Sequence, residues 1–362
     1  MKNGRTLLQL AEELQRQLAS KRDMIVPTVL MDHQTQGGET SIAITAPDGV
    51  QSYKTTELFR RQLADKLKIP FAYFERMRAT QPELLDRNVN TWLKNEPEQR
   101  MVRTLDGQAR AYLSDRYRRL DNYDLMEHVL PMLRELPGAR IESCELTPVR
   151  MYLKVVTPNV EYEIRRGDII QAGVVISNSE VGQGTLSVQP LIYRLVCSNG
   201  MILPDAAMRK SHVGRTAEAS ENEITLFKDD TLEAEDKAFF LKVRDVVQSA
   251  VSEATFTLAA EKMRRTLGIQ LGADPVKTVE NLGVRYLLNE QERTGVLRHF
   301  ISGGDLSGYG LVNAVTAFAQ DVDDYDRSTE LEALGGKLID QKASDWEALM
   351  AKVRPLPLPA AA

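Results

Sequence analysis

The sequence predicts an α+β protein with a central antiparallel sheet flanked by helices and a mostly helical C-terminal part. Three observations predict this class. Helical periodicity dominates the first hundred residues, strand candidates and a tight turn cluster in the centre, and helical spacing returns after about Leu226. The 362 residues are 43% hydrophobic and 27% charged, which is ordinary for a folded domain protein.

Changes in this pattern of helix and strand signals divide the chain into four parts. We expect a helical N-terminal part (1–98), a central antiparallel sheet domain (99–215), an acidic helical C-terminal part (216–353) and a disordered tail (354–362). No stretch approaches 18 consecutive apolar residues, so we expect no membrane partner. Two cysteines cannot form a disulfide framework, which favours a cytoplasmic protein.

The N-terminal part contains repeated helix signals. Leu7, Leu10, Leu14 and Leu18 recur at helical steps, and Thr56 is suited to cap a helix that runs through about Leu67. Further helices are expected around 71–77 and 81–94. Between these helices, the partly alternating stretch 34–50 predicts one short hairpin.

The centre is rich in strands. Asp106-Gly107 is a strong two-residue turn signal between strands 101–105 and 108–113. A helix over 123–136 and further strands follow, at 141–146, 150–156, 161–165, 169–177 and 185–197. The remaining chain predicts helices over 229–267, 276–300, 309–320, 328–341 and 343–353.

Charge is unevenly distributed along the chain. Residues 1–99 carry a formal charge of +1, residues 100–215 carry +3, and residues 216–362 carry −9, within a total of −5. Such asymmetry is typical of a protein whose binding surface and acidic regulatory part are separate. Ordinary variation in surface charge explains the same numbers without any function.

The central turn gives the most specific hypothesis about binding. A regular two-residue loop pairs Arg103 with Arg110 and places Tyr112 on the same sheet face. Two arginines bind phosphate well, and a neighbouring tyrosine can stack on a base. The competing interpretation is that nearby carboxylates, Asp106 or Asp115, neutralise the pair.

Two further basic clusters extend the candidate nucleic-acid-binding site. The first consists of Arg116, Tyr117, Arg118 and Arg119, which has the composition of a phosphate-contacting loop. The second consists of Arg209, Lys210 and Arg215. Ordinary solvated turns have similar compositions, so both interpretations stay open.

Catalytic signals are weak. Two cysteines and four histidines are few for a zinc site, and we expect no catalytic residue, metal or cofactor. The alternative is a metal-dependent DNA-processing enzyme, in which Glu161, Glu163, Asp168 or Glu180 converge in one pocket.

Four motifs together resemble a known family. They are Ser114–Arg118, Asn178–Gly182, Arg194–Met201 and Tyr309–Thr316, and they are similar to segments of the phage and plasmid proteins grouped as domain-of-unknown-function family 932. The resemblance spans about residues 100–320. It implies a mobile-element origin and action in the cytoplasm of a bacterial host cell, and it carries over no catalytic residue.

The leading expectation is a nucleic-acid-binding protein, with single-stranded DNA the favoured partner, acting in replication, recombination or annealing. Annealing proteins act as multimers, so a homo-oligomer is expected. A further alternative makes the acidic C-terminal part the working surface, contacting or inhibiting a host or phage protein.

Overall fold

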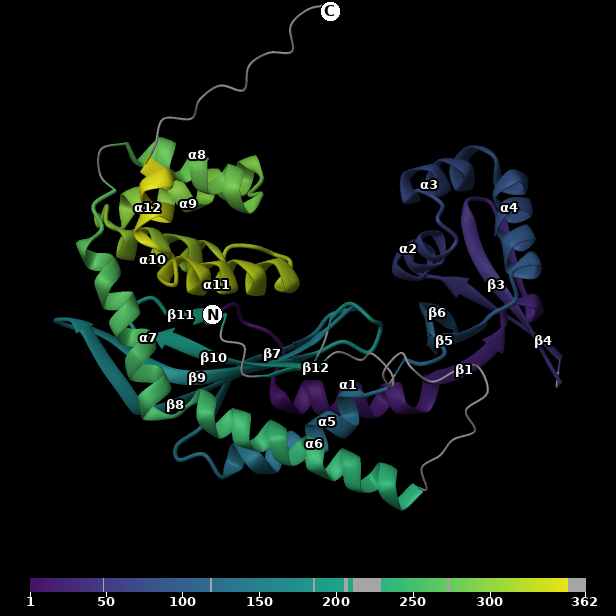
Figure 1. Ribbon diagram of the computed structural model, residues 1–362, viewed down its shortest axis with the longest axis horizontal. Helices are drawn as coiled ribbons and strands as arrows, with labels where there is room; N and C mark the ends of the chain where they lie inside the picture. Colours follow the sequence, from purple (N-terminus) through teal and green to yellow (C-terminus); the bar gives the residue numbers. More distant parts are fainter. Residues whose placement is uncertain are drawn as a thin grey trace, which may run out of the picture.

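The strands of the described chain form two separate sheets, and each sheet carries its own helices (Figure 1). The computed structural model describes residues 1–47, 49–117, 119–184, 186–204, 208–210, 229–271 and 274–350. An α+β fold with a helical C-terminal part is confirmed, but the strands make two sheets where we expected one central sheet.

The first sheet forms a lobe of its own, which we call the inserted lobe (residues 22–114). Its strands lie in the order β1-β5-β6-β4-β3-β2, antiparallel except for a short parallel pairing of β4 with β6. The elements are β1 (Arg22–Pro27), a 3-10 turn (Thr28–Leu30), β2 (Met31–Gln36), β3 (Glu39–Ala46), β4 (Gly49–Thr55), α2 (Glu57–Lys66), α3 (Phe71–Thr80), α4 (Pro82–Asn95), β5 (Gln99–Leu105) and β6 (Gln108–Ser114).

Local sequence signals explain where the helices of this lobe begin. Thr56 accepts a hydrogen bond from the Phe59 amide and caps α2 as expected, and Pro82 occupies the first turn of α4. The inner faces of α2, α3 and α4 pack on one face of the sheet and build its apolar core, which includes Phe59, Phe74 and Val89.

The N-terminal part contains more strand than the sequence predicted, with four strands in place of one hairpin. The reason is visible in β2, whose buried side includes the polar residues His33 and Thr35. Both bond to Asp86 of α4 (2.7 Å from His33 Nδ1 and 2.7 Å from Thr35 Oγ1). Because tertiary partners satisfy these polar groups, the strand lacks the apolar alternation that identifies strands in a sequence.

The second sheet belongs to what we call the main lobe (residues 1–20 and 122–350). It is antiparallel, and its strands lie in the order β7-β8-β9-β10-β11. The short strand β12 pairs with the start of β10, and β11 pairs with its end. The strands are β7 (Arg140–Leu146), β8 (Met151–Arg165), β9 (Asp168–Asn178), β10 (Leu186–Arg194), β11 (Asn199–Ile202) and β12 (Met208–Lys210).

Helices cover both faces of this second sheet. One face packs on α1, α5 and α6, and the other packs on a layer built from α7 to α12 (Figure 1). The helices are α1 (Leu7–Ser20), α5 (Asn122–Arg134), α6 (Asp229–Ala250), α7 (Glu253–Arg265), a 3-10 turn (Thr266–Gly268), α8 (Pro275–Tyr286), α9 (Glu290–Ser302), α10 (Gly308–Phe318), α11 (Tyr325–Ile339) and α12 (Ala343–Met350).

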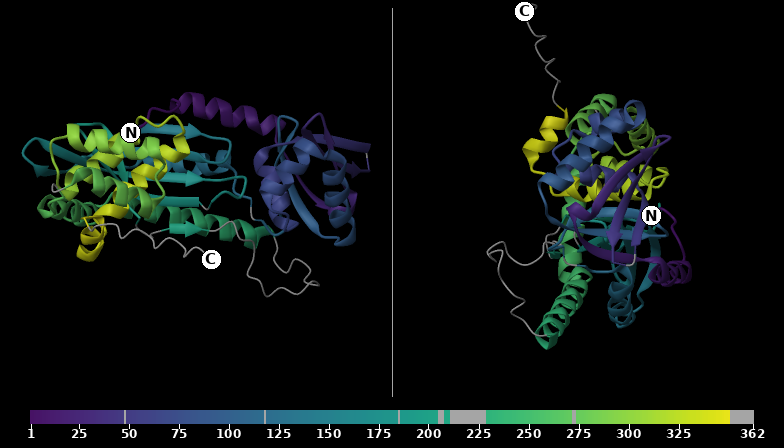
Figure 2. Two further views of the ribbon diagram at one scale, coloured as in Figure 1. Left: turned by 90° about the horizontal axis from the view of Figure 1, so that it is seen from above. Right: turned by 90° about the vertical axis from the view of Figure 1, so that its right-hand side faces the viewer.

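The inserted lobe interrupts the main lobe between α1 and α5. The chain leaves the main lobe at Lys21 and returns through residues 115–121, so two chain crossings join the lobes. Figure 2 shows α1 running beside the second sheet toward the inserted lobe. These crossings bring the central basic residues next to the main lobe, which decides their environment.

Candidate nucleic-acid interface

The Asp106-Gly107 turn forms as predicted, but the strands that leave it are not in regular register. Asp106 and Gly107 have φ angles of 51° and 73°, as a tight hairpin turn requires. A bulge between Arg103 and Thr104 pairs Thr104 with Ala109 and Arg103 with Ala111. Arg103 therefore does not face Arg110 across the sheet, and that prediction was wrong.

Arg103 is also not available to a ligand. Its side chain is fully buried between the lobes, where Nε and Nη2 donate to the Asp23 carboxylate at 2.8 and 2.9 Å. Nη2 also donates to Asp121 at 2.5 Å, and Nη1 donates to the backbone oxygen of Glu180 at 2.8 Å. Carboxylates from two separate segments neutralise this guanidinium, so the interpretation of Arg103 as an outward phosphate contact was wrong.

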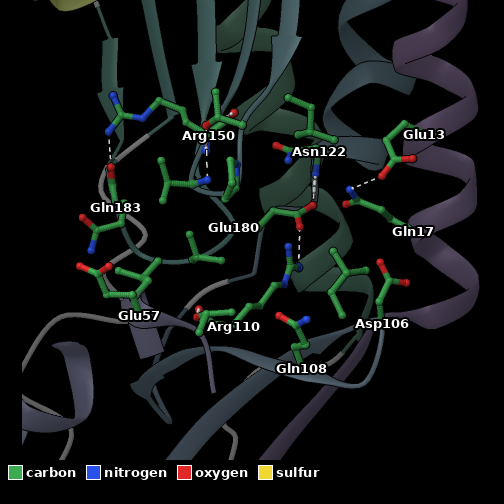
Figure 3. A pocket seen from close by; sticks show the side chains of 18 of the residues that line it. Glu13, Gln17, Glu57, Asp106, Gln108, Arg110, Asn122, Arg150, Glu180 and Gln183 are labelled. Atoms are coloured by element: carbon green, nitrogen blue, oxygen red, sulfur yellow. Dashed lines mark hydrogen bonds and ion pairs between the residues drawn. The ribbon is translucent and has the colours of Figure 1, made fainter. Parts of the chain in front are cut away.

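Glu180, in the loop after β9, is the second centre of this buried network. Its carboxylate accepts hydrogen bonds from Arg110 Nη2 (2.6 Å) and the Asn122 amide (2.7 Å) (Figure 3), and a third from Lys21 Nζ (2.8 Å). Burial alone raises the pKa of a carboxyl, but Arg110, Lys21 and Arg103 outweigh it and lower the pKa of Glu180 to about 2. Glu180 is thus an anion at neutral pH that ties both lobes together.

The two tyrosines of the candidate site are structural. Tyr112 is buried in the core of the inserted lobe, edge-on to Phe59, so it cannot stack on a base. The Tyr117 hydroxyl donates to the backbone oxygen of Ser179 at 3.0 Å, and burial raises the pKa of Tyr117 to about 12. Tyr117 thus belongs to the junction between the lobes, like Arg110, which Glu180 neutralises.

Two predicted arginines do lie on the surface. Arg116 is exposed and forms no ion pair with a described residue. Arg119 is 60% exposed, and its guanidinium lies 3.7 Å from Asp23. Arg118 and Arg215 lie outside the described residues, and Arg209 and Lys210 lie in β12, of which only the backbone is described.

A cleft of about 760 Å³ opens beside the Glu180 network, between α1, the β5–β6 turn, the start of α2 and the β7–β8 and β9–β10 loops (Figure 3). This volume is in the usual range for ligand sites. Its charged lining residues are Arg5, Glu13, Arg16, Glu57, Arg61, Asp106, Arg110, Arg150 and Glu180.

Most arginines of the cleft are paired. Arg16 bridges Glu13 and Asp106 at 2.8 and 2.9 Å, and Arg61 pairs with Glu57 at 2.9 Å. Arg5 similarly pairs with Glu145, at 2.7 Å.

Arg150 differs from the other cleft arginines. Its guanidinium donates to the backbone oxygen of Gln183 and forms no ion pair with a described carboxylate. Arg150 is therefore a cleft cation whose positive charge no described carboxylate neutralises. Sequence reasoning missed it, because one arginine in a strand connection carries no composition signal.

The four motifs meet in two pairs. Ser114–Arg118 contacts Asn178–Gly182 at the junction between the lobes, through Tyr117 and Ser179. Arg194–Met201 packs against Tyr309–Thr316, where Asn199 Nδ2 donates to Thr316 Oγ1 at 2.5 Å. The motif residues with described contacts thus hold segments together that are far apart in the chain.

The carboxylates suggested for a metal-dependent enzyme do not converge. Asp168 accepts hydrogen bonds from Arg194 (2.7 and 2.6 Å) and from the Tyr309 hydroxyl (2.7 Å). Glu161 and Glu163 are exposed near the end of β8, whereas Glu180 lies at the junction between the lobes. In the described part of the chain, no group of three or more His, Cys, Asp or Glu side chains is placed to hold a metal ion.

Several acidic residues of the C-terminal part bind within the chain. Asp321 accepts hydrogen bonds from Arg298 and His299, and Asp326 accepts one from Tyr152. Glu332 is fully buried and pairs with Lys154 at 2.5 Å. These carboxylates stabilise the main lobe, which leaves fewer free acidic groups than the sequence suggested.

Comparisons of the chain with known protein families, curated proteins and solved structures found no match. None of the helices in the described ranges has the length and hydropathy that a membrane crossing requires. The function of this chain therefore has to be inferred from the cleft itself.

Proposed function

We propose that this chain is a nucleic-acid-binding protein that holds a single strand, preferably DNA, with its phosphate backbone in the cleft between the lobes. The observation that carries the proposal is Arg150, an arginine without a carboxylate partner in a cleft whose other arginines are paired. A phosphate is the natural partner for such a guanidinium, because it accepts two parallel hydrogen bonds.

Two exposed cations lie close to the cleft in the sequence. Arg119 lies three residues before Asn122, which lines the cleft, and Arg116 precedes it on the same crossing. Together with Arg150 they offer about three phosphate contacts. Counterion release then predicts a slope near −2 when log Kd⁻¹ is plotted against log salt concentration, since each contact contributes about −0.7 for a single strand.

The resemblance to phage and plasmid proteins agrees with this proposal. Replication, recombination and annealing in mobile elements all expose single strands that need a binding protein. The proposal places the protein in the cytoplasm of a bacterial host cell and includes self-association on the DNA. It requires no cofactor, because the phosphate contacts of the cleft are made by side chains of the protein.

Fluorescence anisotropy of a labelled oligo(dT) in a series of salt concentrations tests the proposal. We expect binding at low salt that weakens with the slope given above. Absence of binding to DNA and RNA at low salt refutes the proposal, and equal binding to a duplex refutes its preference for a single strand.

The variant Arg150→Ala tests the role of the cleft. We expect it to weaken binding by about tenfold and to make the salt slope shallower by about 0.7, since one phosphate contact is lost. Arg298→Ala is the matched control, because it removes the same charge from an exposed position on α9 in the main lobe. Equal loss in both variants means that net charge, rather than the cleft, governs binding.

A further inference from the structure

Two large aromatic side chains are exposed beside each other on the inserted lobe. Tyr73 of α3 is 47% exposed and Trp92 of α4 is 42% exposed, and both line a groove of about 540 Å³. Aromatic rings of this size normally contribute most of their area to a core. Two of them on one open groove are typical of a binding surface.

Neither ring is needed for the core of the lobe. The inner faces of α3 and α4 already bury Phe74, Met77 and Val89, on the sides of the helices that face the sheet. Trp92 Nε1 donates to Asn88 Oδ1 one helical turn earlier, at 3.0 Å. This bond fixes the indole ring on its own helix, and 42% of the residue stays exposed to solvent.

The charges around the groove favour an anionic ligand. Lys66 and Lys68 line it together with the single acidic residue Glu96. Lys66 lies 3.6 Å from Glu98, with both side chains 44% exposed, so solvent screens this pair strongly. Lys68 is exposed and forms no ion pair with a carboxylate in the described ranges.

The cleft and the groove lie at opposite ends of α2. The first turn of α2 lines the cleft and its last residue lines the groove, and the helix between them is only ~15 Å long. Arg61, which lines the cleft, holds its guanidinium 4.1 Å from the centre of the Phe71 ring, and Phe71 follows Pro70 of the groove. A strand of a few nucleotides is long enough to span this helix, so one strand can occupy both the cleft and the groove.

We propose that the groove between Tyr73 and Trp92 is a base-stacking site that extends the cleft, so that one strand places its phosphates in the cleft and its bases on these rings. This inference rests on the proposed function and adds where bases bind. Aromatic rings bordered by lysines bind single strands of many sequences, since every base has a π face and every nucleotide a phosphate.

Tryptophan fluorescence gives a direct test with the full chain and oligo(dT). The sequence contains two tryptophans, and Trp346 is only 3% exposed in the core of the main lobe. A change on adding oligonucleotide therefore reports mainly on Trp92. We expect quenching that follows the anisotropy curve, and no quenching in Trp92→Phe, which keeps a stacking ring and near-normal affinity.

Affinity measurements provide the second part of the test. Trp92→Ala and Tyr73→Ala each remove one stacking ring and are expected to weaken binding at least fivefold, at the low end for base stacking. Leu84→Ala is the control, because Leu84 is a similarly exposed apolar residue of α4 that does not line the groove. We expect this control to bind like the unaltered chain.

The outcomes separate this inference from the proposed function. If no oligonucleotide binds, both fail. If binding depends on Arg150 but Trp92 is not quenched and Trp92→Ala binds normally, the groove inference is overturned and the cleft proposal stands. Quenching by a proline-rich peptide but not by oligo(dT) also overturns it, since such peptides bind aromatic grooves too.

Discussion

Replacing Glu180 by Gln removes the negative charge that two cationic side chains and one backbone amide share at the junction between the lobes. Gln keeps an oxygen that can accept a hydrogen bond, so the change isolates the charge. Arg110, which is largely buried, then loses its carboxylate partner, and the buried Lys21 keeps only Asp121, at 3.6 Å. Leaving a buried charge without its partner costs about 3–5 kcal/mol.

The pKa of Glu180 gives an independent figure for the same quantity. A fall from the ordinary 4.5 to about 2 stabilises the folded state by about 3 kcal/mol at neutral pH, since each pKa unit is worth ~1.36 kcal/mol. The two figures agree. We therefore expect Glu180→Gln to lower the free energy of unfolding by about 3 kcal/mol at pH 7.

The same reasoning predicts how the loss depends on pH. Because the pKa of Glu180 is lower in the folded than in the unfolded chain, its contribution is complete above about pH 4.5 and disappears as the pH falls toward 2. The stability difference between the unaltered chain and Glu180→Gln should thus shrink from about 3 kcal/mol at pH 7 to about 1.5 kcal/mol at pH 3. Urea unfolding followed by circular dichroism measures this difference.

Glu13→Gln is the control for burial. The pKa of Glu13 is also lowered to about 2, chiefly by its hydrogen bond from Arg16, but Arg16 is half exposed. Solvent screening limits such a pair to about 1 kcal/mol or less. If both variants lose the same small amount, or if the Glu180→Gln difference does not shrink in acid, the assignment of Glu180 as the buried anion of the junction is wrong.

Two further stability predictions concern the main lobe. Gly336→Ala should lower the free energy of unfolding by about 3 kcal/mol, because the added Cβ would lie 1.9 Å from the Ile202 backbone oxygen. The control Gly268→Ala, with open space around it, should change stability by less than about 0.5 kcal/mol. Equal midpoints of urea unfolding in the two variants would contradict this prediction. Lys154→Met should lower the free energy of unfolding by about 3–5 kcal/mol, because it leaves the buried Glu332 without its partner. The double variant Lys154→Met/Glu332→Leu should recover most of this loss, since no buried charge remains. A double variant that is no more stable than Lys154→Met refutes the reasoning.

Local sequence signals predicted the elements that are determined by their own cap or turn residues. Thr56 and Pro82 mark helix starts that the structure has, and Asp106-Gly107 forms the expected turn. The expected helix over 229–267 is divided at Ser252, whose hydroxyl caps α7. For Thr56 and the Asp106-Gly107 turn the deciding interaction lies within a few residues of the chain, so the sequence alone exposes it, whereas the break at Ser252 was not predicted.

The candidate site could not be predicted in the same way. Arg103 looks like a surface cation in sequence, but its partners Asp23 and Asp121 come from segments on either side of it, 80 and 18 residues away. Nothing within the hairpin indicates that the main lobe covers this face of the sheet. Arg150 shows the reverse case, since its lack of a carboxylate partner is visible only once its neighbours are in place.

The sequence by itself determined the α+β class, most helices and the central turn, because caps, turn residues and apolar periodicity act over short distances. Only the tertiary structure decided which charges are neutralised and which are free. Coulomb energy depends on distance and burial rather than on position in the chain, so a buried ion pair and an open phosphate contact can arise from the same residue types. Arg103, Arg110 and Glu180 are neutralised because the two chain crossings bring their segments together at the junction between the lobes.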